Sequence, residues 1–181
     1  DDTYQFSDNF GRDTINEVSG DETLDFTRVT SRLTISSSNL TTVTVAGVGN
    51  VNKVTYIGSP QNGVLTIKLR ALTLDPALEH RIFLSELTED LQVTVKTGNL
   101  LVVKVKTTGQ EVLRVHNVSN VELGTANDRV IFDKGATLRG YLKGGGGLDW
   151  LDYGGLTPGS LNNSAYSAPV NVNITNDPEP F

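Results

Sequence analysis

One stretch of this 181-residue chain combines glycines and a carboxylate in an order that suits cation binding. It reads Gly144-Gly145-Gly146-Gly147-Leu148-Asp149-Trp150-Leu151-Asp152 and fits the nonapeptide G-G-x-G-x-D-x-U-x, where U is a large apolar residue, at every specified position. Glycines adopt backbone angles that other residues avoid, so carbonyl oxygens can converge at such a turn. The carboxylate of Asp149 adds anionic oxygen, which suits Ca²⁺ with its roughly six to eight oxygen ligands.

Four other carboxylates stand in incomplete versions of this pattern. Asp13 follows Gly11, and Glu22 follows Gly20, each at the spacing that separates Asp149 from Gly147. Asp128 lies in the stretch from Gly124 to Val130, whereas Asp2 has no glycine turn before it. The candidate calcium ligands are therefore Asp149, Asp128, Asp13, Glu22 and Asp2, with Gly145 and Gly147 in the turn.

Two parts of the chain also repeat each other. Residues 1–6 align with residues 127–132, and residues 20–26 align with residues 147–153. The offset is 126 in the first alignment and 127 in the second, so a single register fits both. We expect two related blocks, 1–36 and 118–175, which flank a β-rich insert at 37–117, and a C-terminal tail at 176–181.

These motifs resemble the RTX, or haemolysin-type, calcium-binding repeats of large secreted bacterial surface proteins. In that family each nonapeptide makes a Gly-rich turn and a short strand, successive turns wind a parallel β-roll, and calcium lies between turns two repeats apart. Here Asp2 and Glu22 are 20 residues apart and Asp128 and Asp149 are 21 apart, slightly more than two nonapeptides. The resemblance covers about half of the chain and implies Ca²⁺ as the cofactor.

A simpler interpretation remains open for each of these residues. A Gly-rich stretch that ends in Asp is often only a turn with a solvated carboxylate. Asp25 and Asp152 take the last place of the motif, where we expect solvation or hydrogen bonds to turn amides. The aromatic residues Phe26, Phe132, Trp150 and Tyr153 are expected to pack the interior rather than to bind a sugar.

Other features of the sequence argue against several functions. Neither His80 nor His116 has zinc-ligand spacing or a neighbouring G-x-S-x-G turn, so we expect no enzymatic activity. The formal net charge of −6, with no cluster of Lys and Arg in the sequence, argues against nucleic-acid binding. The longest apolar run, 100–103, is far too short to span a membrane. Cysteine is absent, which excludes disulfides and thiolate metal sites.

Most segments have the period-two alternation and the Val, Ile and Thr content of β-strands. Strands are predicted at 33–35, 42–45, 64–69, 91–95, 102–105 and 170–174, with Gly- and Asn-rich turns between them. Only Asp75 to Arg81 suggests a helix, of two turns at most. The predicted fold is all-β, with RTX-like β-roll or β-helix turns at both ends and a sandwich or extended β-solenoid as the insert.

The function expected from these features is structural. We expect an extracellular, calcium-stabilised repeat module of a bacterial adhesin, surface layer or filament, located at the cell surface or secreted. The chain opens within a repeat whose turn is missing, so its expected partners are copies of itself or adjacent repeats of a longer chain. The alternative is a non-catalytic carbohydrate- or ice-binding accessory module of a secreted protein, with a glycan as the partner.

Overall fold

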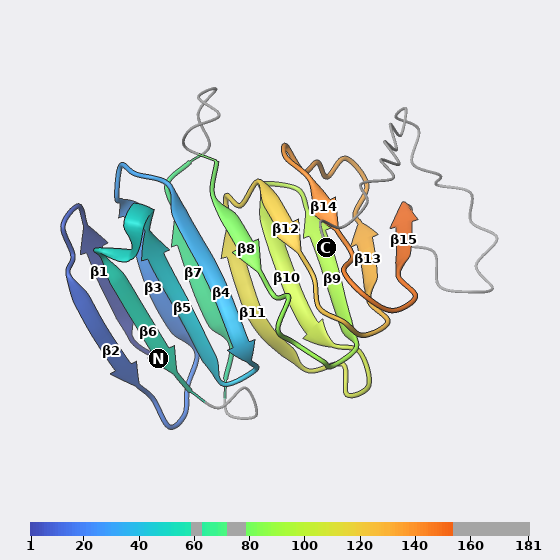
Figure 1. The fold of residues 1–181 in the computed structure, drawn as a ribbon, viewed down its shortest axis with the longest axis horizontal. Helices are drawn as coiled ribbons and strands as arrows, with labels where there is room; N and C mark the ends of the chain where they lie inside the picture. The colour runs from blue at the N-terminus through green and yellow to red at the C-terminus, as the bar shows by residue number, and fades with distance from the viewer. Residues whose placement is uncertain (59–62, 72–78, 154–181) are drawn as a thin grey trace, which may run out of the picture.

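The chain folds into two mixed β-sheets that lie one over the other (Figure 1). The computed structural model describes residues 1–58, 63–71 and 79–153. The first sheet, called sheet A, contains β1 (Thr3–Ser7), β3 (Glu22–Arg28), β7 (Leu65–Leu69), β9 (Leu91–Lys96), β10 (Leu100–Val105), β11 (Glu111–His116), β13 (Arg129–Phe132) and β15 (Trp150–Tyr153). The second, sheet B, contains β2 (Arg12–Asn16), β4 (Leu33–Asn39), β5 (Thr42–Gly47), β6 (Lys53–Ile57), β8 (Arg81–Phe83), β12 (Asn120–Glu122) and β14 (Leu142–Lys143).

The chain passes repeatedly from one sheet to the other. Strands β1, β2, β3 and β4 alternate between sheets A and B, and so do β11 to β15. Strands from successive passages pair in parallel, for example β1 with β3 and β13 with β15. Two stretches, β4 to β6 and β9 to β11, instead fold back within one sheet as antiparallel strands.

Side chains on the facing surfaces of the two sheets form one hydrophobic core. Along β4, Leu33 and Ile35 are fully buried, whereas Thr34 between them and Ser36 after them are half-buried on the outer face. The same alternation places Leu24 and Phe26 of β3 in that core. Burial of alternate apolar side chains stabilises both sheets, because each side chain removed from water contributes about 1.5–3 kcal/mol.

The sequence predictions for secondary structure are largely confirmed. The all-β class is correct, and five predicted strands coincide with β4, β5, β7, β9 and β10. The strand predicted at 170–174 and most of the helix predicted at 75–81 lie outside the described residues, and Arg81 begins β8. Within the described part, no helix is long and apolar enough to cross a membrane.

The two blocks that align in sequence make equivalent local contacts. The amide of Thr23 donates to the Asp2 carbonyl at 2.8 Å, and the amide of Trp150 donates to the Asp128 carbonyl at 2.9 Å. The rings of Phe6 and Phe26 stack with centroids 4.4 Å apart. At the aligned positions, Phe132 and Tyr153 stack at 4.8 Å. Both blocks therefore join parallel strands in the same way, and the strands of residues 37–117 continue the same two sheets between them.

Candidate functional site

Three carboxylates gather at the end of the molecule formed by β1, β2 and β3. One oxygen from each of Asp2, Glu17 and Glu22 lies within 4.8 Å of the others, and within the described residues this is the one group of three such side chains. Asp2 and Glu22 were predicted from the sequence as metal ligands, whereas Glu17 was not. Glu17 joins them because its amide donates to the Ile57 carbonyl at 2.9 Å, which extends the pairing of β2 with β6.

Glu22 occupies an inward position of sheet A. Its side chain is 1% exposed and shares the face of β3 that carries Leu24 and Phe26. Its Oε2 accepts a hydrogen bond of 3.4 Å from the Tyr56 hydroxyl of sheet B, but its buried Oε1 has no hydrogen-bond partner. A buried carboxylate oxygen without a hydrogen-bond partner is costly unless a positive charge lies close to it.

The surroundings of the acidic cluster hold its carboxylates in place. The Tyr4 hydroxyl donates to Glu17 Oε1, and this hydrogen bond, together with burial, raises the pKa of Tyr4 to about 12. Burial and the neighbouring Glu22 raise the pKa of Tyr56 to about 12. Both tyrosines therefore stay protonated and donate at neutral pH. Among the described residues, Glu22 forms one ion pair: the N-terminal ammonium of Asp1 lies 3.6 Å from its Oε1.

Gly20 makes room for the Glu22 carboxylate. Its φ of +113° belongs to the region that favours glycine, and a Cβ at this position would lie 2.7 Å from Glu22 Oε1. The turn before β3 thus requires glycine both for its backbone angle and for the space beside the carboxylate.

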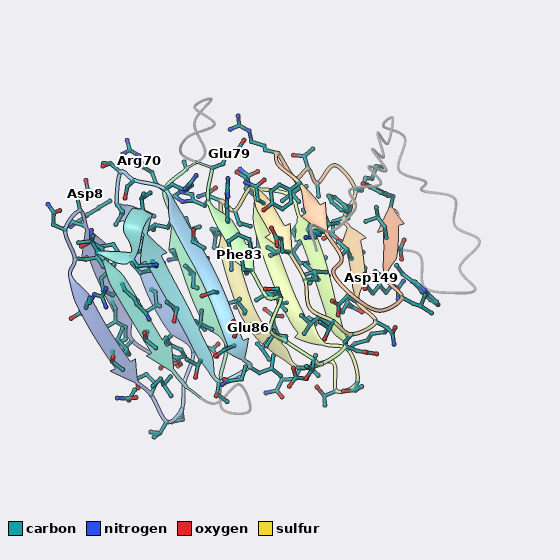
Figure 2. The ribbon with its side chains drawn as sticks, in the orientation of Figure 1. Asp8, Arg70, Glu79, Phe83, Glu86 and Asp149 are labelled. Atoms are coloured by element: carbon teal, nitrogen blue, oxygen red, sulfur yellow. The ribbon has the colours of Figure 1, made fainter. Side chains whose placement is uncertain are left out.

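The Gly-rich turn at residues 144–149 lies directly on the preceding turn at residues 123–128. Gly145 and Gly147 both have positive φ, and a Cβ on Gly145 would lie 2.8 Å from the Leu123 carbonyl oxygen. The Gly146 amide donates to the Gly124 carbonyl at 3.0 Å. The glycines of the nonapeptide therefore allow one turn to stack closely on the other. Figure 2 shows Asp149 at this end of the molecule, well apart from Glu86.

The aspartates of the stacked turns act as hydrogen-bond acceptors between turns. Asp149 Oδ1 accepts from the Asp128 amide at 2.9 Å, and Asp128 Oδ1 accepts from the Leu91 amide at 2.8 Å. At the other end of the molecule, Asp1 Oδ1 accepts from the Asp21 amide at 2.7 Å. Each carboxylate accepts a hydrogen bond from a backbone amide of the neighbouring turn. Without the carboxylate, that amide would have no acceptor where the turns stack.

Asp128 is the buried member of this series, with an exposed fraction of 1%. Burial raises the pKa of Asp128, and the nearby charges of Asp149 and Asp90 raise it further. Its Oδ2 is buried and has no hydrogen-bond partner. In this respect it resembles Glu22 at the opposite end of the molecule.

The remaining predicted residues lie apart from these two places. Asp13 is exposed on β2, an edge strand of sheet B, and is not in the acidic cluster. Asp25 accepts hydrogen bonds from the amide and hydroxyl of Thr27, and Asp152 pairs with Arg129 at 2.5 Å. Among the aromatic residues, Phe26 and Phe132 are buried as expected, whereas Trp150 is 68% exposed.

Sequence reasoning missed two contributors. Glu17 carries no motif, and only the packing of the end of β2 beside β3 brings it to Asp2 and Glu22. Asp90 follows Glu89 and belongs to no motif in the sequence, yet its Oδ1 accepts from the Asn127 amide at 3.1 Å and its Oδ2 pairs with Lys106 at 3.5 Å. The only hint in the sequence was its place directly before a predicted strand.

Comparison of the chain with protein-family models, curated proteins and solved structures finds no match.

Proposed function

We propose that this chain is an extracellular, calcium-stabilised structural module, similar to an RTX roll, of a bacterial adhesin, surface layer or filament. The observation that carries the proposal is the buried Glu22 Oε1, which lacks a hydrogen-bond partner and lies beside Asp2 and Glu17. A divalent cation at this point would offset the charge of the three carboxylates.

The spacing of the three carboxylates suits one shared ion. Calcium–oxygen distances are about 2.3–2.6 Å, so two oxygens on the same ion lie at most about 5 Å apart. The three oxygens here lie within 4.8 Å of one another. Because Asp2 and Glu17 remain partly accessible to water, solvent can supply the other ligands that calcium needs.

A second calcium position is proposed at the Gly-rich turn. Asp128 Oδ2 is buried and unpaired there, and Asp149 belongs to the neighbouring turn. The carbonyl groups of Gly145 and Gly147 are further oxygen ligands in the proposal, as the resemblance to RTX repeats implies. Asp13 is proposed only as a weak, exposed ligand of the same type.

Glu22→Gln provides the decisive test. The substitution keeps the shape of the side chain and removes its charge, so calcium affinity should fall by about tenfold or more. Tb³⁺ can replace Ca²⁺ as a luminescent probe, since Tyr4 and Tyr56 contact the ligands and can sensitise its emission. Glu86→Gln, an exposed carboxylate outside the cluster, is the matched control.

Thermal melts give an independent measure. Calcium at about 100 times its Kd should stabilise the wild-type fold by about 2.7 kcal/mol, or a rise in Tm of about 5–11 °C for a chain of this size. Glu22→Gln should be at least as stable as wild type in EDTA, because a buried charge is gone. Calcium should stabilise it less than the wild type, because only the position proposed at the Gly-rich turn remains. Equal calcium shifts for the wild type and Glu22→Gln would refute the cation site.

Asp149→Asn tests the second position separately, by the loss of a second binding event in the Tb³⁺ titration. If one event is seen for both the wild type and Asp149→Asn, the proposal is restricted to the acidic cluster.

In this proposal the module has no enzymatic activity and works through contacts with copies of itself or with adjacent repeats of a longer chain. Strands β1 and β15 are the outer strands of sheet A within the described residues, and outer strands carry unpaired backbone groups. Light scattering with millimolar calcium tests the contact between copies. A strictly monomeric species at all concentrations would exclude it.

A further inference from the structure

An open hollow on the outer face of sheet B gathers positive charge in an otherwise acidic protein. Its volume is about 480 Å³, and its lining includes Arg12, Arg32 and Lys53. Among the described residues that line it, none is acidic. The whole chain has 15 basic residues against 21 acidic ones, so a lining with three basic residues and no acidic one is a local reversal of charge.

Strand register brings these cations together although they are distant in sequence. Arg12 of β2 lies beside Lys53 of β6, and Lys53 lies beside Ala46 of β5. Neighbouring strands are about 4.8 Å apart, so Arg12 and Lys53 are adjacent like charges, an arrangement that is unfavourable without a counter-charge. Arg32, directly before β4, adds a third cation across the hollow.

The floor of the hollow carries hydroxyl groups. Thr34 and Ser36 of β4 and Thr44 of β5 line it, and Ser36 lies directly opposite Thr44. These side chains are on the outer face because their neighbours, such as Ile35 and Val45, are buried between the sheets. A hydroxyl group both donates and accepts hydrogen bonds, which suits the hydroxyl groups of a sugar.

One wall of the hollow is the short turn η1 (Val48–Asn50) between β5 and β6. The Arg12 guanidinium donates to the Asn50 carbonyl at 2.9 Å, which fixes this side chain at the rim. A guanidinium has five N–H donors in a rigid fork, so others remain for a planar or tetrahedral oxyanion. Val48 in this wall and Val51 directly after it are 64% and 71% exposed.

We propose that this hollow binds an acidic saccharide through its carboxylate or sulfate groups. The volume lies within the range of about 300–1,000 Å³ that small-molecule sites occupy and exceeds the needs of a lone oxyanion. No aromatic ring lines the hollow among the described residues, which disfavours nucleic-acid bases, since these bind by stacking. The site is separate from the acidic cluster. It places carbohydrate binding, the alternative function expected from the sequence, on the outer face of sheet B.

The test is calorimetric titration of the full chain in buffer without divalent cations, which would otherwise bridge carboxylates. The probes are an oligogalacturonate, a sulfated carrageenan oligosaccharide, a neutral cello-oligosaccharide and inorganic sulfate. We expect one or both acidic saccharides to bind, the neutral one not to bind, and the affinity to fall with added salt. The carboxylated and sulfated arms identify which oxyanion is preferred.

The double variant Arg32→Gln/Lys53→Gln should weaken saccharide binding by at least about tenfold, because charge-assisted hydrogen bonds are lost. The double variant Arg28→Gln/Lys68→Gln makes the same change of charge on strands of sheet A and should bind as wild type does. Melting temperatures of both variants confirm that they fold. An equal loss of saccharide affinity in both double variants, no binding of either acidic saccharide, or tighter binding of inorganic sulfate than of the saccharides would overturn the proposal.

Discussion

Replacement of Gly124 by Ala tests whether the stacked turns control stability. Gly124 is buried, and its φ is outside the region that favours glycine, so Ala has no backbone penalty there. An added Cβ would nevertheless lie well inside 3.0 Å of the Leu87 carbonyl oxygen, a separation that real Cβ atoms essentially never show. The turn that contains Gly124 and the segment that contains Leu87 must therefore move apart to accept a single methyl group.

The expected cost follows from the contacts that such a movement disturbs. Overpacking of a tight contact costs about 1–3 kcal/mol. The Thr125 amide donates to the Leu87 carbonyl at 3.1 Å, and the Gly146 amide donates to the Gly124 carbonyl at 3.0 Å. Each hydrogen bond contributes about 0.5–1.5 kcal/mol, so we expect Gly124→Ala to lose about 2–6 kcal/mol in total. The Tm should fall by at least about 4 °C.

Two other glycines provide controls for urea unfolding of the same protein. Gly98 has a φ of +76° but open space around it, so Gly98→Ala should cost only about 1–2 kcal/mol from its backbone angle. Gly47 has ordinary backbone angles and no close neighbour, so Gly47→Ala should be neutral or slightly stabilising. If Gly98→Ala is more destabilising than Gly124→Ala, backbone angle rather than turn stacking limits stability, and the reasoning is refuted.

Three further predictions concern other parts of the fold. Phe26 is fully buried against the Phe6 and Phe10 rings, so Phe26→Ala should cost about 3–5 kcal/mol in urea unfolding, whereas the exposed Trp150→Ala should change little; similar losses for both would contradict this packing. Burial lowers the pKa of His80 below its usual 6.5, and the Leu33 amide donates to its Nδ1 at 3.0 Å, which requires a neutral ring. The contribution of neutral His80 to stability should be complete above about pH 6.5 and lost as the pH falls through the lower folded-state pKa. When the free energy of unfolding is measured against pH, His80→Asn should therefore show a flatter profile than the wild type. An unchanged profile would assign the acid sensitivity to another group. In EDTA, the free energy of unfolding of Asp149→Ala should be about 0.5–1.5 kcal/mol lower than that of Asp149→Asn, because only Asn keeps an acceptor for the Asp128 amide. Equal melting temperatures for the two variants would exclude this role of Asp149.

The sequence by itself determined the class of the fold and the positions of five strands, β4, β5, β7, β9 and β10. Apolar and polar residues alternate along β4, where Leu33 and Ile35 are apolar and Thr34 and Ser36 are polar. This alternation depends only on which residues prefer water, so it is visible without any tertiary information. The glycine turns were also visible, since Gly145 and Gly147 need backbone angles that few other residues adopt. The sequence alignment of Phe6 with Phe132 and of Phe26 with Tyr153 likewise matched two equivalent ring stacks.

Only the tertiary structure decided which side chains meet. The acidic cluster needs the end of β2 beside the start of β3, and the basic hollow needs β2, β6 and β5 in one register. Arg12, Arg32 and Lys53 form no cluster along the chain, just as Glu17 belongs to no motif. Period-two alternation fixes which face a residue takes but not which strand lies next to it. That neighbour is set by the stacking of turns and the shared core between the sheets, both of which join residues far apart in sequence.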